Sequence, residues 1–465
     1  MRKFDKDKYL KKLKFQKYKR YIYLGIPCLV LIVIGIYFTY SKFSVLKDTE
    51  VVRTTVGEFI QGDIVLTPYI DGEYSKEFPK DEVGINVEKV TCDNDAVGEW
   101  DEDNWRLKVT NLTKRTKCNV YFVTPKSCGI NDNVSCINSR EGLANLATEV
   151  NNGDDKSGKI YYLTSDIDLG GKFDSNGNAL DGNTSWTPIG IGESQFQGVF
   201  DGNGHIINNL YINSSGLVSL FNYTNDAVIK NLGIENSYLK SSDGMAGAIA
   251  GESHTTRIVN CYSKAIVIGK DCVSGIVARF NGAVKNCYNA GNISASGQFA
   301  GGIVGYLNGS SSMAAVYNSY NYGVISANRE AAGIAGGSQA KIGNTYNLGN
   351  INGATSGGIA GQYYTPSSPQ VYNSYNSGKI TTGGGILGEV YTGYDSNLIR
   401  NNYFLEGTAT YGLYNVSSNT GTETLSKDKM PSVISVINED NAFVEDTNNI
   451  NNGYPILKWQ QERNN

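Results

Sequence analysis

Seven asparagines recur along the second half of the chain, separated by 26 to 32 residues. They are Asn231, Asn260, Asn286, Asn318, Asn344, Asn373 and Asn401. A valine or isoleucine stands two positions before each of them, and the residues in between share no common character. An aliphatic position followed by a variable one is typical of a strand with one buried face. The repeat therefore predicts a short strand in every copy, with a bend at the asparagine.

Two further aliphatic columns accompany the first. One lies among small residues and consists of Ile249, Ile276, Ile303, Ile334, Ile359 and Ile386. The other follows the asparagine by seven residues and consists of Val267, Ile293, Ile325, Ile351 and Ile380. Three inward strands per repeat suit a stack of coils, because like residues then lie above one another at the ~4.8 Å spacing of a sheet.

We therefore predict an all-β fold, a right-handed parallel β-helix with three short strands per coil over residues 159–420. The asparagine column is expected to form an inward ladder at the bend, with side-chain amides hydrogen-bonded from coil to coil. An open stack exposes unpaired backbone groups, so both ends should be capped.

Both candidate caps are visible as sequence patterns. Residues 126–158 read as a linker with a capping helix, in which Asn138 caps the N-terminus. Its apolar residues Leu143, Leu146, Ala147 and Val150 fall at helical spacing. Residues 421–465 are expected to form the second cap, with a helix near 425–436 and a strand near 453–459.

The N-terminal part has a different organisation. Residues 21–40 are apolar throughout and long enough to span a bilayer, with no A-x-A-like cleavage site at their end. Residues 1–20 hold ten Lys/Arg and two Asp, which favours a cytoplasmic tail and an extracellular C-terminal region. Residues 41–60 follow as a stalk. Residues 61–125 alternate apolar and polar positions and predict a small β-sandwich-like module.

Charge and cysteine usage agree with a single-pass protein of a cell membrane. Beyond residue 20 the chain has 31 basic and 43 acidic residues, a net charge of −12, which gives no reason to expect nucleic-acid binding. An extracellular setting permits disulfides, and we predict Cys92–Cys118 and Cys128–Cys136, although spacing does not fix the connectivity. Cys261 and Cys287 occupy the same column of adjacent repeats and are expected to form a reduced, stacked pair.

The repeated blocks resemble a known motif. Gly302-Ile303-Val304-Gly305 and its copies are similar to the GLUG motif, which is named for its Gly-Leu/Ile-x-Gly core. Such arrays occur in bacterial surface adhesins and as accessory regions of immunoglobulin-A metallopeptidases. Residues 90–122 resemble a module found near the anchor of Gram-positive surface proteins. The resemblance implies a surface location and a β-helix. Peptidase activity does not carry over, because no H-E-x-x-H motif is present.

Residues for catalysis are sparse. The two histidines, His205 and His254, lie in different repeats and lack the i, i+4 spacing of a helical zinc site. Asp166, Asp168 and Asp201 form the one tight acidic set, whereas β-helix lyases and hydrolases carry acids along an exposed sheet. We therefore expect no enzymatic activity and no cofactor, with a glycan-active lyase or hydrolase kept as an alternative.

One segment places oxygen-bearing side chains at alternate positions, loosely like a calcium loop. Its residues are Asp174, Asn176, Asn178 and Asp181. The bidentate glutamate that ends such loops is missing. A structural calcium site and an ordinary polar turn both remain open.

The ligand-binding hypothesis comes from loop lengths. Long loops leave one edge of the predicted helix and carry Tyr306, Tyr363, Tyr364, Tyr391 and Tyr394. Exposed tyrosines stack on sugars or anchor a protein partner, although a chain with 31 tyrosines also places them in loops by chance. We therefore expect a membrane-anchored, adhesin-like protein that binds a glycan or protein ligand. A structural surface spacer is the alternative.

Overall fold

A computed structural model describes seven strands between residues 49 and 123, and then residues 133–464 except 312, 364–369, 391–395, 416–420 and 439–440. The chain divides into two compact units, residues 1–126 and residues 127–465. Among the described residues, no helix combines the length and apolar character that crossing a membrane requires. The predicted span at residues 21–40 lies outside them.

The first unit contains two antiparallel sheets. One has the order β1 (Thr49–Val51), β2 (Ile60–Leu66), β7 (Thr116–Val123) and β4 (Asn86–Cys92). The other has the order β3 (Tyr74–Glu77), β6 (Arg106–Thr110) and β5 (Val97–Asp101). Strand β1 pairs with β2, so part of the segment expected to be a stalk belongs to a sheet.

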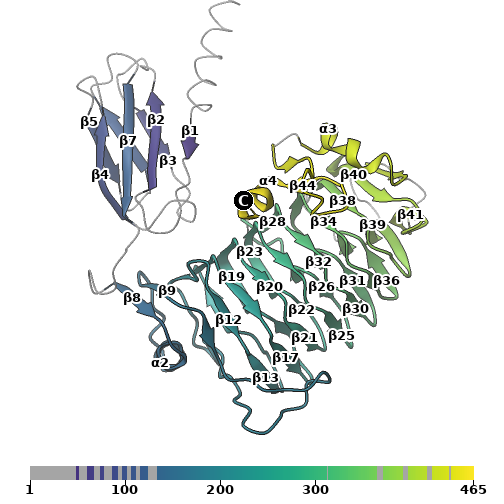
Figure 1. Cartoon of the computed structure of the whole chain (residues 1–465), viewed down its shortest axis with the longest axis horizontal. Coiled ribbons are helices and arrows are strands. Elements are labelled where there is room, and N and C mark those ends of the chain that lie inside the picture. The colour runs from purple at the N-terminus through teal and green to yellow at the C-terminus, as the bar shows by residue number, and fades with distance from the viewer. Residues whose placement is uncertain are drawn as a thin grey trace, which may run out of the picture. The chain divides into compact units, whose positions relative to one another are not determined.

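The second unit is a parallel β-solenoid of about ten turns, which confirms the predicted class of fold (Figure 1). Each regular coil holds five short strands, so the prediction of three per coil is wrong. One coil consists of β31 (Glu330–Ala332), β32 (Ala335–Ser338), β33 (Lys341–Gly343), β34 (Tyr346–Asn347) and β35 (Ile351–Asn352). Aliphatic columns reveal only strands that bury aliphatic residues, and the remaining inward positions carry alanine, serine, threonine and asparagine.

Equivalent strands pair in parallel from coil to coil and form five rows. The first row ends at the repeating asparagine and contains β8 (Val134–Ile137), β9 (Ile160–Leu163), β11 (Val199–Asp201), β15 (Val228–Lys230), the ends of β19 (Ala250–Val259) and β23 (Val277–Lys285), β28 (Ala315–Tyr317), β33, and the starts of β38 (Val371–Asn376) and β40 (Ile399–Leu405). The second row follows that asparagine and contains β10 (Ile167–Asp168), β12 (Ile206–Asn208), β16 (Gly233–Glu235), β20 (Tyr262–Ser263), β24 (Tyr288–Asn289), β29 (Tyr320–Asn321), β34, the ends of β38 and β40, and β42 (Thr422–Leu425).

The other three rows complete each coil. The third contains β13 (Tyr211–Ser214), β17 (Tyr238–Ser241), β21 (Ile266–Gly269), β25 (Ile293–Ala295), β30 (Ile325–Ala327) and β35. The fourth contains β18 (Ala246–Gly247), β22 (Val273–Ser274), β26 (Ala300–Gly301), β31, β36 (Thr355–Gly357) and the start of β39 (Gly383–Val390). The fifth contains β14 (Phe221–Asn225), the starts of β19 and β23, β27 (Val304–Leu307), β32, β37 (Ala360–Tyr363), the end of β39, and β41 (Tyr411–Tyr414).

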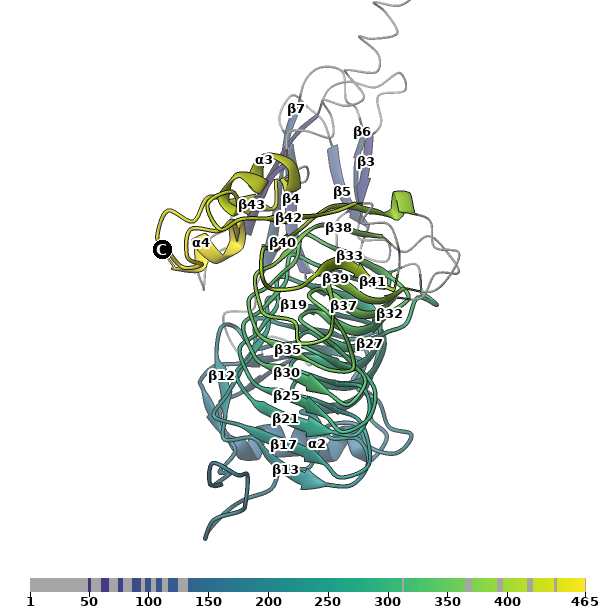
Figure 2. The same cartoon turned by 90° about the vertical axis from the view of Figure 1, so that its right-hand side faces the viewer.

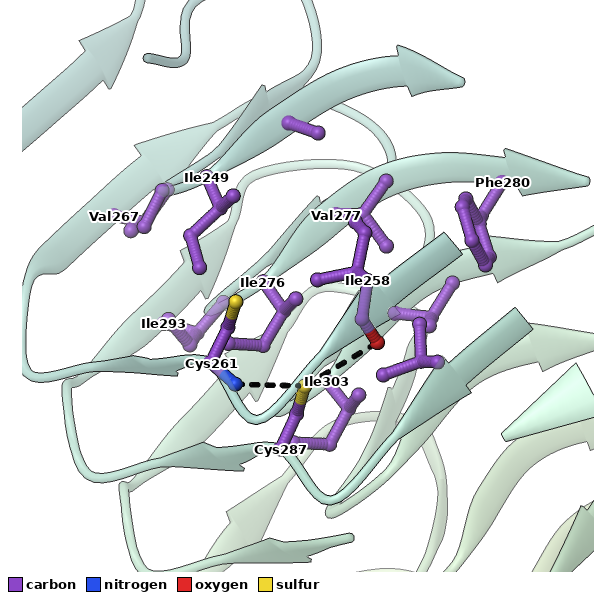
Figure 3. Packing of buried hydrophobic residues seen from close by; sticks show 14 of the residues in the cluster. Ile249, Ile258, Cys261, Val267, Ile276, Val277, Phe280, Cys287, Ile293 and Ile303 are labelled. Carbon is purple, nitrogen blue, oxygen red and sulfur yellow. Dashed lines mark hydrogen bonds between the residues drawn. The ribbon is translucent and has the colours of Figure 1, made fainter. Parts of the chain in front are cut away.

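The three predicted aliphatic columns do line the interior. Figure 3 shows Ile249, Ile276 and Ile303 from successive coils pointing into the same core, and each of them is fully buried. Cys261 and Cys287 lie beside them as free thiols, as predicted. The Cys261 N–H donates to Cys287 Sγ at 3.4 Å, and that sulfur lies 3.6 Å from the carbonyl oxygen of Ile258. Burial raises the pKa of the Cys261 thiol, which keeps it protonated.

The helix predicted before the coils is α2 (Arg140–Asn151). Its cap is Ser139, one residue after the predicted Asn138, and the Ser139 hydroxyl accepts a hydrogen bond from the Gly142 N–H at 3.2 Å. The four predicted apolar residues of the helix are all buried and join the core of the first coils. Because this apolar face lies against the stack, α2 covers interior that the first coil would otherwise expose to water.

The C-terminal segment differs from its prediction. Strand β42 still pairs with β40, and the expected helix is only a 3-10 turn, η2 (Met430–Val433), followed by the short α3 (Ile434–Ile437). The strand predicted near 453–459 is present as β44 (Ile456–Leu457), which forms a hairpin with β43 (Phe443–Val444) and is followed by a helix that was not predicted, α4 (Lys458–Asn464). In Figure 2 this yellow segment lies along one side of the coils. It therefore covers a lateral face of the solenoid.

Candidate binding surface

The predicted asparagine ladder stands at the bend between the first and second rows. All seven asparagines have a left-handed backbone, with φ between 49° and 56°. Asparagine tolerates this conformation better than other non-glycine residues, which explains its recurrence there. Side-chain amides bridge successive coils in four places, Asn260 to Asn231, Asn286 to Asn260, Asn373 to Asn344 and Asn401 to Asn373, at 3.0 to 3.3 Å. Exposure varies from the buried Asn373 to the exposed Asn260, so this outer ladder lines the bend and is not wholly inward.

A second amide ladder lies inside the solenoid and was not predicted. It consists of Asn289, Asn321, Asn347 and Asn376, each 0% exposed. Each Nδ2 donates to the Oδ1 of the next member at 2.7 to 2.8 Å. Each side chain also bonds the N–H and C=O of the glycine two residues later, at 2.8 to 3.2 Å. The sequence signal was an Asn-x-Gly that starts three residues after an outer-ladder asparagine.

A ladder of tyrosines runs along the outer side of the second row. Its members are Tyr262, Tyr288, Tyr320, Tyr346 and Tyr375, and neighbouring rings are 4.8 to 5.0 Å apart and within 5° of parallel. The C-terminal segment covers much of it. The Trp459 ring lies 5.6 Å from Tyr320, and its Nε1 donates to the carbonyl oxygen of Asn318 at 2.9 Å. The Tyr346 hydroxyl donates to Gln460 Oε1 at 2.8 Å. These aromatic side chains therefore hold the C-terminal segment in place.

The tyrosines predicted to bind a ligand lie in different environments. Tyr363 is 1% exposed and belongs to the hydrophobic core, so its proposed role in surface binding is wrong. It stands in register with Ser338 and Val390, whose side chains also point inward. Tyr364, Tyr391 and Tyr394 lie outside the described residues. Tyr306 stays half-buried at the surface of the fifth row.

Tyr306 belongs to one column of side chains along the fifth row. The column, here called the Tyr306 column, consists of Tyr223, Glu252, Arg279, Tyr306, Gly337, Gln362, Glu389 and Tyr414. Tyr306 and Phe299 lie with ring centroids 5.1 Å apart. A Cβ atom on Gly337 would come within 2.8 Å of both rings, so the missing side chain makes room for them. Phe299 has a φ of 39° and is only 8% exposed, so its buried ring packs beneath the half-buried ring of Tyr306.

Polar groups continue this column beyond the aromatic pair. Gln362 Nε2 donates to Glu389 Oε2 at 2.9 Å, and Arg279 lies 3.7 Å from Glu252. Glu330 lies close by but is 1% exposed, with Arg329 3.1 Å away. Burial raises the pKa of Glu330, and the Arg329 guanidinium opposes that effect. Because its carboxylate is inaccessible, Glu330 does not form with Glu389 the accessible acid pair of a β-helix hydrolase.

The acids and histidines noted in the sequence bind neighbouring backbone and side-chain groups of the coils. Asp166 accepts from the Ile206 N–H at 3.0 Å and lies 3.1 Å from His205 Nδ1. Asp168 accepts from Gly170 N–H at 2.7 Å and from Asn209 Nδ2 at 2.9 Å. Asp201 accepts from Asn231 Nδ2 at 2.9 Å, so it starts the outer ladder. His254 lies elsewhere, 3.8 Å from Glu252.

The calcium-like segment forms a polar turn in which Asp174 is the acceptor. Its Oδ1 accepts from the N–H groups of Asn176 and Asn178 at 2.9 and 2.8 Å, and its Oδ2 accepts from Asn178 Nδ2 at 2.9 Å. The hydrogen bonds from Asn178 hold the pKa of Asp174 below its usual range. A calcium ion at Asp174, Asn176, Asn178 and Asp181 would have to displace these bonds. No group of three or more His, Cys, Asp or Glu side chains suited to a metal occurs within the described part of the chain.

The disulfide predictions fall largely outside the described side chains. The backbone register sets Cys92 opposite Cys118 across β4 and β7, and this pairing stays a prediction because nothing is described of either side chain. Cys136 is disulfide-bonded. Its predicted partner, Cys128, lies outside the described residues, so that pairing is also still a prediction.

Comparison with known proteins gives distant similarities. No protein-family model matches the chain. A stretch of 199 residues is 26% identical to halomucin from Haloquadratum walsbyi and covers 36% of this chain but 2% of halomucin. Among solved structures, a proposed immunoglobulin A1 protease from Bacteroides ovatus is 24% identical, has a TM-score of 0.45, and the match covers 72% of this chain and 95% of that chain. These similarities are too distant to assign an activity, and membership of the GLUG family stays a prediction.

Proposed function

We propose that the chain is a membrane-anchored, adhesin-like protein of a Gram-positive bacterial surface that binds or displays a ligand and catalyses no reaction. Residues 21–40 would form the single membrane span, with the C-terminal region outside the cell. The two N-terminal sheets would pack as a β-sandwich-like module, and the GLUG-type coils would wind in the right-handed sense.

One observation carries the binding proposal. The Tyr306 and Phe299 rings lie together over Gly337, on a row of strands that the hydrogen-bonded ladders hold in register. The buried Phe299 ring fixes the half-buried Tyr306 ring, and a fixed ring offers contact area at a low cost in conformational entropy, which suits the face of a sugar ring or a protein side chain. The half-buried Glu389 supplies a carboxylate three rungs further along the same column, where the buried Gln362 donates a hydrogen bond to it.

The test uses the full chain, purified in mild detergent, on an array of glycans and matrix proteins, with turnover of every hit measured in parallel. Tyr306→Ala should abolish the saturable binding, because it removes one ring of the pair. Tyr411→Ala is the matched control, since Tyr411 is 53% exposed and lies outside the Tyr306 column. Turnover of a bound glycan would overturn the non-catalytic proposal.

A structural spacer is the second candidate, and the two amide ladders favour it because they stiffen the stack without offering a ligand site. The same array separates the two functions. A spacer binds nothing on it, and shortening the solenoid by one coil would then change only the reach of the protein from the membrane.

A further inference from the structure

Glu330 carries a carboxylate that the fold buries without hydrogen bonds. It belongs to β31, where the neighbouring Ala331 points into the hydrophobic core, so strand alternation turns Glu330 to the outer side of the fourth row. Its side chain is nevertheless 1% exposed, and neither carboxylate oxygen accepts a hydrogen bond from any residue that the structure describes. Buried polar groups are normally hydrogen-bonded, so a group of this kind indicates a further partner such as an ion.

A corner between the fourth and fifth rows encloses this carboxylate. Gly361 of the fifth row stands against the fourth-row strand, since a Cβ atom on Gly361 would lie 3.1 Å from the carbonyl oxygen of Ala331. The residue after Gly361 is Gln362, and the residue before Ala331 is Glu330. The close approach of the two strands therefore brings Gln362 and Glu330 to the same corner.

The same contact recurs one coil further on. A Cβ atom on Gly388 would lie 2.9 Å from the carbonyl group of Ser356, which brings Glu389 and Thr355 to the corner as well. Thr355 is in register with Glu330 and Glu389 with Gln362, so the two contacts are one rung of ~4.8 Å apart. We call the oxygen-bearing side chains that meet here the Glu330 corner, which consists of Glu330, Thr355 and Glu389.

The charges at the Glu330 corner do not balance. Arg329 Nη2 lies 3.1 Å from Glu330 Oε1, and the Arg329 side chain is 55% exposed. Glu389, whose Oε2 accepts a hydrogen bond from Gln362 Nε2 at 2.9 Å, repels the Glu330 carboxylate. Among the described residues, Arg329 and Glu389 are the charged groups that act on Glu330. Two carboxylates therefore face one guanidinium, and buried net charge costs free energy unless a cation or a proton compensates it.

We propose that the Glu330 corner binds a calcium ion. Calcium takes about six to eight oxygen ligands from carboxylates, neutral oxygens and water, and the corner supplies two carboxylates and the Thr355 hydroxyl. The half-exposed Arg329 side chain can turn into solvent when the ion binds Glu330. The site has two acids, so it differs from the groups of three or more that the described residues lack. The ion would connect the fourth and fifth rows across three coils, and this role does not depend on the binding function proposed above.

The test measures thermal unfolding by circular dichroism and calcium binding by calorimetry. It uses the full chain in mild detergent, freed of metal with a chelator, with CaCl2, MgCl2 or NaCl added at equal ionic strength. The site variant is Glu330→Gln with Glu389→Gln. The matched control is Asp174→Asn with Asp181→Asn, which removes the same charge from the calcium-like turn. The single Glu389→Gln change, at a half-buried position, keeps the test valid if the double variant does not fold.

We expect calcium to stabilise the wild type and the turn variant equally. Extracellular calcium sites have dissociation constants of roughly 0.1–1 mM, so about 5 mM CaCl2 should raise the unfolding midpoint by about 2–4 °C. Magnesium should have little effect, because it is smaller and gives up its water reluctantly. The site variant should lose both the calcium-dependent rise and the heat of calcium binding. In metal-free buffer it should unfold no earlier than the wild type, because two repelling carboxylates are gone.

Three results would overturn the proposal. A rise that the turn variant loses and the site variant keeps would place the ion at the calcium-like turn. A rise that both variants keep would place it elsewhere in the chain. No rise in the wild type, together with a site variant at least as stable, would show that a proton compensates the Glu330 corner. None of these results involves the glycan and matrix-protein array, so the proposed binding function is tested separately.

Discussion

The two amide ladders use the same residue for different physical purposes. At the outer ladder, asparagine is needed for its backbone, because every member has a left-handed φ, and some side chains are open to solvent. At the inner ladder, asparagine is needed for its side chain, because each amide satisfies two backbone groups and its neighbour in a fully buried site. The comparison shows that repetition of a residue does not tell which part of it a fold uses.

The largest loss of stability is expected at the inner amide ladder. Asn347→Leu would leave the N–H and C=O of Gly349 without their side-chain partner. It would also remove one of the two hydrogen bonds of the Asn321 amide and of the Asn376 carbonyl oxygen. Because an unsatisfied buried group costs about 1–3 kcal/mol, the free energy of unfolding should fall by about 4 kcal/mol or more. Urea denaturation followed by circular dichroism measures this loss. Asn352→Ala is the control at an exposed position of the third row, and a similar loss there would contradict the prediction.

A smaller loss of stability is expected at the tyrosine ladder, which points outward and is largely covered by the C-terminal segment. Trp459→Ala removes the ring over Tyr320 and the hydrogen bond to Asn318, and should cost about 2 kcal/mol because Trp459 is half-buried. The loss should appear as faster hydrogen exchange in α4 and β44, with the coils unchanged. Trp459→Phe keeps an aromatic ring but lacks the N–H donor, so its loss of stability should lie between those of wild type and Trp459→Ala. Loss of protection throughout the coils would show that the segment stabilises more than its own contacts.

The outer ladder should respond to backbone chemistry. Asn260→Ala places a side chain that disfavours φ 56° at an exposed bend and should cost about 1–2 kcal/mol, whereas Asn260→Gly should cost less because glycine adopts that backbone freely. Thermal unfolding midpoints of the two variants test this order. The φ of Asn347 is not positive, so Asn347→Gly should lower the unfolding midpoint at least as much as Asn347→Leu. Equal losses for both Asn260 variants would show that its amide matters more than its backbone.

The smallest effect concerns the start of the tyrosine ladder and depends on pH. Burial alone would raise the pKa of Glu235, but hydrogen bonds from Lys264 and Tyr262, both at 2.7 Å, outweigh it and hold the pKa below its usual value. Stability from a lowered carboxyl pKa is present above the unfolded-state value and is lost as pH falls through the folded-state value. Because Lys264 is half-exposed, Glu235→Gln should cost about 0.5 kcal/mol at neutral pH, and the difference should vanish well below about pH 4. A difference that persists in acid would point to packing.

The fold was largely predictable because its aliphatic columns repeat, and a buried aliphatic at fixed spacing has one simple explanation. The number of strands per coil was not predictable in that way, since the inner ladder and the small inward residues read as turn or loop positions. Asn347 and Gly349 look like a turn in the sequence, and only the neighbouring coils make them an interior rung. The prediction for Tyr363 failed because a shift of one position between Gln362 and Tyr363 exchanges an outward side chain for an inward one.

The outward positions of the first row show the opposite limitation. Tyr317 follows Lys285 by 32 residues and Tyr372 follows Tyr317 by 55, yet register places all three in one column. Spacing alone identified the column without showing which outward side chains become neighbours, because each strand contributes one residue to it. A surface that forms by stacking can be predicted only once the register of the coils is known. The repeating sequence gives that register, but motif searches do not compare the outward positions of successive coils.

The attachment of the C-terminal segment to Tyr320, Tyr346 and Tyr375 also bears on how such a protein could change length during evolution. Contacts of α4 and its hairpin are made with the later coils, and α2 contacts the earliest ones. A gene duplication that inserts one whole repeat ahead of Tyr262 would therefore leave both terminal attachments intact. Each such event would lengthen the solenoid by one rung of ~4.8 Å. Insertions of other lengths leave the ladders intact only where they enter loops, as in the repeats that vary from 26 to 32 residues, so selection should favour chains that grow by complete coils.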